Sequence, residues 1–66
     1  MHVIESAVVV GRSIGENDVY IINNPLTGGN STIHNPNGVA LELGQEGTLT
    51  YKKEAVNHFV SFEPSL

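Results

Sequence analysis

The sequence contains no cysteine, and only three of its 66 residues are lysine or arginine. Without cysteine, the fold can use neither a disulfide nor a thiolate zinc site for stability. The three basic residues, Arg12, Lys52 and Lys53, stand against seven acidic ones. Nucleic-acid binding draws its affinity from Lys and Arg that neutralise phosphates, so this composition argues against a nucleic-acid partner.

Long hydrophobic runs are also missing. No stretch approaches the roughly 18 consecutive apolar residues of a membrane-spanning helix. The amino end, which begins at Met1, lacks the basic region and apolar core of a signal peptide. We therefore expect no membrane partner, and a complete cytoplasmic product or virion component without a recognisable secretion signal.

The chain is short, and 66 residues lie near the lower limit for a self-sufficient fold. Small folds usually rely on disulfides, a metal or oligomerisation for additional stability. Because disulfides are excluded, we expect one domain over residues 1–66 that assembles with itself or docks on another protein. A well-packed lone barrel is the alternative.

Two apolar runs organise the sequence, Ala7 to Val10 and Val19 to Ile22. Side chains alternate across a strand, so a run without polar residues presents apolar groups to both faces of its sheet. These runs predict a hairpin that needs cover on both sides, which is more than a chain of this size supplies. The predicted interface residues are Val8, Val10, Tyr20, Ile22, Leu26 and Leu66.

Turn residues recur about every ten positions, which is typical of small antiparallel β folds. We predict an all-β protein, a small antiparallel sandwich or partly open barrel of five to six short strands. The predicted strands cover 2–12, 19–23, 31–34, 39–43, 48–52 and 58–63. In the last strand, simple alternation places Phe59 with Ser61 on one face and Val60 with Phe62 on the other.

Residues 23–38 form a polar region rich in Asn, Gly, Pro, Ser and Thr, and 64–66 form a predicted tail. Each of the two Asn-Pro pairs in the polar region is expected to end a strand. The strongest turn signal is Asn35–Pro36–Asn37–Gly38. The region as a whole could be a surface loop or an arm that lies over a neighbouring subunit.

No motif in the sequence carries recognisable chemistry. The spacing of His2, His34 and His58 matches no metal site, although their titration could make assembly pH-sensitive if they lie at an interface. The turn around Asp18 lacks the ligand spacing of a calcium loop, and Gly28-Gly29 lacks the lysine of a phosphate-binding loop. We therefore predict no catalytic residue, no cofactor and no metal, and expect the four aromatic residues to lie in the core.

These features favour a non-enzymatic structural or interaction subunit that completes its core by assembly. Its most concrete form is a viral capsid-decoration (cement) protein or a tail-type structural protein, as a homo-oligomer or docked on a larger shell. The alternative is a small β-barrel binding module or inhibitor that docks a protein partner by a strand edge.

Overall fold

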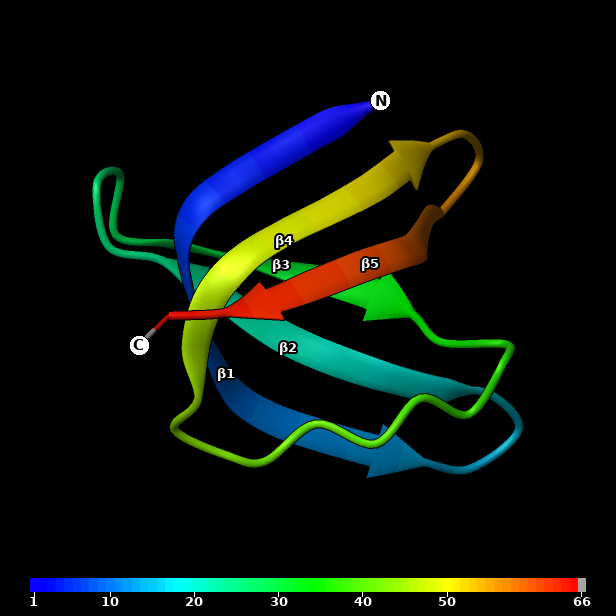
Figure 1. Ribbon diagram of the computed structural model, residues 1–66. Coiled ribbons are helices and arrows are strands. Elements are labelled where there is room, and N and C mark those ends of the chain that lie inside the picture. Colours follow the sequence, from blue (N-terminus) through cyan, green and yellow to red (C-terminus); the bar gives the residue numbers. More distant parts are fainter. Residues whose placement is uncertain (66) are drawn as a thin grey trace.

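The computed structural model describes residues 1–65, and Leu66 lies outside the described residues. Its strands are β1 (His2–Ile14), β2 (Asp18–Asn24), β3 (Gly29–His34), β4 (Glu46–Lys53) and β5 (Asn57–Pro64). They curl into a small closed barrel, and the described chain contains no helix (Figure 1). The predicted all-β class is confirmed. No helix in this part of the chain could cross a membrane.

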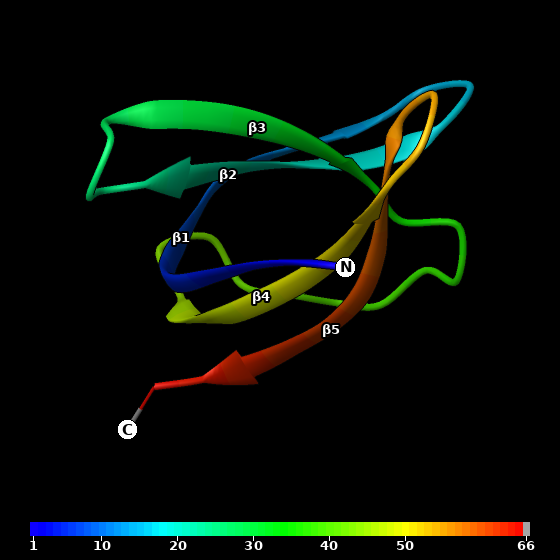
Figure 2. The same cartoon turned by 90° about the horizontal axis from the view of Figure 1, so that it is seen from above.

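The strand order around the barrel is β1-β2-β3-β5-β4, and β4 pairs back with β1. All neighbouring strands are antiparallel except β3 and β5, which run parallel and pair only through Ile33–Asn57 and His34–His58. An all-antiparallel sheet was expected, so this pair is a correction. It arises because the chain crosses the barrel end between β3 and β4 before β5 closes the sheet (Figure 2). The connectivity is that of the OB-fold, a five-stranded Greek-key barrel.

The core fills the barrel with the inward residues of the strands. The hydrophobic side chains exposed by 8% or less are Ile4, Ala7, Val9, Tyr20, Ile22, Ile33 and Leu49. Tyr51, Phe59, Phe62 and Leu41 are partly buried against them. The four aromatic residues therefore contribute to the core, as predicted.

Residues 35–45, called the strap here, cross the barrel end in front of β1 and β2 (Figure 1). The strand predicted at 39–43 is wrong, because this segment is irregular. Two backbone groups of the strap form hydrogen bonds with a side chain and not with a neighbouring strand. The Tyr20 hydroxyl donates to the Val39 carbonyl and accepts from the Leu41 N–H, both at 2.8 Å. Leu41 packs on the core, whereas Leu43 is 66% exposed.

The turn predicted at the start of the strap is present. The Gly38 N–H donates to the Asn35 carbonyl at 3.2 Å, and Gly38 adopts a φ of 65°, which favours glycine. Both Asn-Pro pairs lie at strand ends, since Asn24 is the last residue of β2 and Asn35 comes directly after the last residue of β3, His34. The polar region 23–38 is therefore partly sheet, because β3 lies within it.

A bulge changes the alternation of β5. Thr50 pairs with Ser61 and Tyr51 pairs with Phe59, so Val60 is an additional residue without its own partner on β4. Phe59 and Phe62 consequently share the inward face, while Val60 is 44% exposed. The predicted sharing of faces, Phe59 with Ser61 and Phe62 with Val60, is wrong because a bulge resets the two-residue period.

Candidate interaction surfaces

The outward side of β2, of β3 and of the part of β1 that pairs with β2, from Val8 on, forms one surface, called the outer sheet face here. Cross-strand partners share a face, and Val8 pairs with Asn23 while Ile21 pairs with Thr32. Neighbouring residues of these strands point into the core. The outward-facing residues are Val8, Val10, Ser13, Val19, Ile21, Asn23, Asn30, Thr32 and His34.

The structure separates the six predicted interface residues into three groups. Val8 and Val10 lie on the outer sheet face, where Val8 is half-buried and Val10 is 48% exposed. Tyr20 and Ile22 point inward and are buried in the barrel's own core, which corrects their expected outward placement. Leu26 is exposed in the turn after β2, and Leu66 lies outside the described residues.

The apolar outward positions of β2 belong to Val19 and Ile21, which are not among the six predicted interface residues. Both are half-buried on the outer sheet face. An unbroken apolar run does not reveal which residues point inward, because either register satisfies the pattern. The tyrosine gave no signal either, because its hydroxyl could bond water on the outward side as well as the Val39 and Leu41 backbone on the inward side.

The outer sheet face carries no lysine, arginine, aspartate or glutamate, although the chain has three basic and seven acidic residues. The nearest charge earlier on β1 is Glu5, which is exposed before the part of the strand that pairs with β2. Glu46 of β4, which pairs with Val8, lies at its margin. Four aliphatic side chains occupy its middle, and serine, threonine, asparagine and histidine surround them. This separation of charge from an apolar sheet surface resembles the core of a protein–protein interface.

A polar network joins the start of β2 to the strap. The Arg12 guanidinium donates to both carboxylate oxygens of Asp18, at 3.0 and 2.6 Å, and lies 4.9 Å from the centre of the Tyr20 ring. Asn35, which is 1% exposed, donates to the Val39 carbonyl at 2.8 Å and to Asp18 at 3.4 Å. The Val39 N–H in turn donates a hydrogen bond to Oδ1 of Asn35 at 3.2 Å. These bonds fix the strap on the barrel end.

The network also shifts the titration of its charged members. The hydrogen bonds from Arg12 lower the pKa of Asp18 below its ordinary value, with a smaller contribution in the same direction from Asn35. The same hydrogen bonds raise the pKa of Arg12. Partial desolvation opposes both shifts without reversing them. Asp18 is therefore held as a carboxylate by a structural partner.

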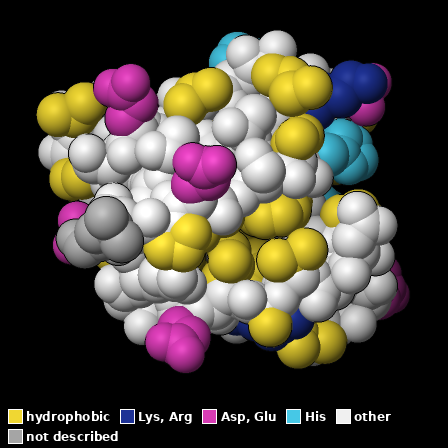
Figure 3. Space-filling model, in the orientation of Figure 1, with side chains coloured by type: hydrophobic (Ala, Val, Ile, Leu, Met, Phe, Trp, Pro, Cys, Tyr) yellow, Lys and Arg dark blue, Asp and Glu magenta, His cyan; other side chains and the backbone are white. Residues whose placement is uncertain are grey.

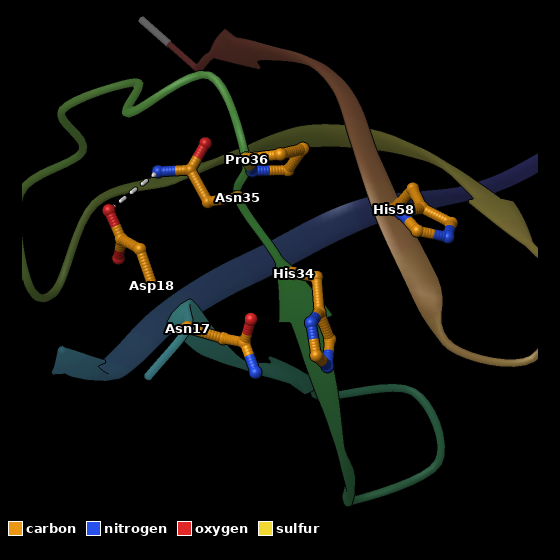
Figure 4. A pocket seen from close by; sticks show the side chains of 6 residues that line it. All are labelled: Asn17, Asp18, His34, Asn35, Pro36 and His58. Atoms are coloured by element: carbon orange, nitrogen blue, oxygen red, sulfur yellow. Dashed lines mark hydrogen bonds between the residues drawn. The ribbon is translucent and has the colours of Figure 1, made fainter. Parts of the chain in front are cut away.

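A small cavity of about 180 Å³ lies beside this network, where β3 meets β5 (Figure 4). The His34 and His58 rings lie in it with their centres 6.4 Å apart. Glu54 is 3.7 Å from His58, whereas His2 stacks on Tyr51 elsewhere, with ring centres 5.3 Å apart. The residues lining the cavity are Asn17, Asp18, His34, Asn35, Pro36 and His58.

The cavity does not assemble a recognisable reactive centre. Its only carboxylate, Asp18, is engaged by Arg12, and the three histidines are not brought together. Within residues 1–65, no group of three or more His, Cys, Asp or Glu side chains is placed to hold a metal ion.

Beyond the cavity, one edge of β5 lacks a neighbouring strand. Only Asn57 and His58 pair with β3, and the strand then continues past the end of β3 to Pro64. In the space-filling view, hydrophobic side chains line a hollow between β5 and the strap (Figure 3). The barrel thus has two candidate surfaces, the outer sheet face and this β5 edge.

No protein-family model, curated protein or solved structure matches the chain.

Proposed function

We propose that the chain is a non-enzymatic structural or interaction subunit that docks on another protein through its outer sheet face. The observation that carries this proposal is the charge-free surface centred on Val8, Val10, Val19 and Ile21. The barrel covers its own inward face, so docking would cover the outward face and is not needed to build the core. Interface centres are depleted of charge in the same way.

The most concrete form of the proposal is a capsid-decoration or tail-type structural protein of a virus, present in the virion or in the host cytoplasm. A small subunit without a catalytic motif, held on a larger shell or on copies of itself, suits this role. Burial of apolar area contributes about 25 cal/mol per Å², so a surface of four aliphatic side chains supports docking with additional polar contacts around it.

The charge distribution favours a protein partner over a nucleic acid. OB-folds often bind oligonucleotides on the face of their second and third strands. Here that face has no basic residue, Arg12 is engaged by Asp18, and Lys52 lies 3.7 Å from Glu54. Phosphate binding would need free positive charge at this position.

A second candidate function, a binding module that docks a partner strand, is favoured by the free edge of β5. An unpaired edge offers backbone hydrogen bonds, and the apolar hollow beside it offers side-chain contacts (Figure 3). Such a module could act as an inhibitor or regulator of its partner.

Site-specific crosslinking in the native host tests the leading proposal. A photoreactive residue at Val10 should join the chain to one large assembly in fixed stoichiometry, whereas the same residue at Glu16, in the exposed turn after β1, should not. Recovery of the chain free in extracts, with no crosslink at Val10, would contradict docking by this face. A crosslink confined to β5 would support the second candidate instead.

A further inference from the structure

The cavity between β3 and β5 has free hydrogen-bonding groups on several of its walls. It lies at the end of the barrel where the β1–β2 turn, the end of β3 and the start of β5 meet (Figure 4). The only hydrogen bond between the side chains of its described lining residues joins Asn35 to Asp18. The amide of Asn17 and the imidazoles of His34 and His58 therefore keep donors and acceptors for a ligand.

The cavity is small and can be reached from solvent. Its volume of about 180 Å³ lies below the roughly 300–1,000 Å³ of pockets that hold drug-sized ligands. Asn17 and Pro36 are exposed, whereas His34 and His58 are half-buried. The space therefore suits a single small ring that enters from outside, and does not suit an extended molecule.

The charges beside the cavity already have partners. Arg12 lies 2.6 Å from Asp18, and Lys52 lies 3.7 Å from Glu54, the carboxylate that approaches His58. None of the residues that line the cavity is a lysine or an arginine. Phosphates and other strong anions are bound through such positive groups. The surroundings consequently favour a ligand that has no net charge.

We propose that this cavity binds one neutral sugar unit, a pyranose ring of a glycan. Each sugar hydroxyl is both a donor and an acceptor, which matches the mixed amide and imidazole groups of Asn17, His34 and His58. The C–H face of a pyranose is apolar, and the Pro36 ring offers it an apolar contact (Figure 4). Small-molecule sites commonly combine apolar surface with a few polar groups that fix the orientation of the ligand.

This ligand and this site differ from protein docking by the outer sheet face, so the inference goes beyond the proposed function. NMR titration of the isolated, isotope-labelled chain with glucose, galactose, mannose and N-acetylglucosamine tests it. At least one sugar should shift the resonances of Asn17, His34 and His58 in a saturable way. The dissociation constant should be about 1 mM, as expected for a ligand of about a dozen heavy atoms.

Substitution of two lining residues should reduce the affinity. Asn17→Ala and His34→Ala each remove hydrogen bonds to the sugar, and each should weaken binding about tenfold. Asn17 lies in an exposed turn, so Asn17→Ala should leave the circular dichroism spectrum of the barrel unchanged. His2→Ala is the matched control, because His2 stacks on Tyr51 outside the cavity, and it should bind the sugar as the wild type does.

The inference is overturned if none of these sugars gives a saturable shift at the cavity. Wild-type affinity in both Asn17→Ala and His34→Ala would also overturn it, as would saturation of the cavity by inorganic phosphate and not by a sugar. Shifts confined to the surroundings of Val10 would place the sugar on the outer sheet face and contradict the assignment. Because the titration uses the isolated chain, failure of the Val10 crosslink would contradict the docking proposal alone.

Discussion

The two faces of the β1–β2 hairpin have nearly the same aliphatic composition but different surroundings. Val9 and Ile22 pair with each other inside the barrel and are 0% and 1% exposed. Val10, next in sequence, is 48% exposed on the outer sheet face. The comparison shows that a continuous apolar run can divide between two environments, with one half building the core and the other half at the surface, where we propose that a partner docks.

The most stringent test of this difference between the two faces is to place a charge on each face in turn. Val9→Asp would bury an unpaired carboxylate and should destabilise the fold by about 4 kcal/mol or more. Val10→Asp should change the free energy of unfolding by about 0.5 kcal/mol or less, because the new carboxylate remains in water. Urea unfolding of both variants measures the difference, and equal losses would show that the outer face is not free.

A second variant tests the close packing that holds β4 against β5. A Cβ atom at Gly47 would collide with the Glu63 backbone and the Phe62 ring. Because the backbone cannot move away without breaking the strand pair, Gly47→Ala should cost about 3 kcal/mol in the free energy of unfolding. Gly15→Ala is the matched control, since its Cβ would meet nothing within 4 Å. A neutral Gly47→Ala would contradict the described register of these strands.

Tyr20→Phe tests the connection between the inner face and the strap. The substitution keeps the ring but leaves the Val39 carbonyl without the hydroxyl donor and the Leu41 N–H without its acceptor. Loss of these partners should cost about 1 to 3 kcal/mol in thermal or urea unfolding. Tyr51→Phe is the control for a tyrosine ring packed against the same core. Amide exchange should become faster in the strap and stay slow in β1.

The smallest expected effect is the acid dependence of the Arg12–Asp18 pair. Because the folded-state pKa of Asp18 is lowered, the pair contributes stability above the ordinary carboxyl pKa and loses it as the pH falls through the lowered value. Asp18→Asn should therefore reduce the loss of stability between about pH 5 and pH 2, whereas Glu16→Gln should not. If the stability of wild type and of Asp18→Asn fell in the same way with decreasing pH, the Arg12–Asp18 pair would not contribute to the acid dependence.

The sequence predicts the fold class, all five observed strands and the turn at Asn35–Gly38, because these depend on local alternation and turn chemistry. It does not predict the facing of Tyr20 or Phe62, since two-sided apolar runs fit either register and bulges have no reliable local signal. The strap was missed for a similar reason. Its strand-like alternation is overridden by a tertiary bond to the Tyr20 hydroxyl, a partner 21 residues from Leu41.

The candidate surfaces were less accessible to sequence reasoning than the fold. Val8 and Val10 were identified, but the adjacent outward residues Val19 and Ile21 required the β1–β2 register. The free edge of β5 depends on the offset of its parallel pairing with β3, which involves residues 24 positions apart in the chain. The register of β3 against β5 is set by closure of the whole barrel, so it has no local signal in the sequence.

Hydroxyl-radical footprinting of the native assembly tests the docking proposal most directly. Val10 should react in the isolated protein and become protected in the assembly, while Ile14, 72% exposed at the end of the same strand, should stay reactive in both. Equal reactivity of Val10 in the two states would contradict the assignment of the outer sheet face as the docking surface.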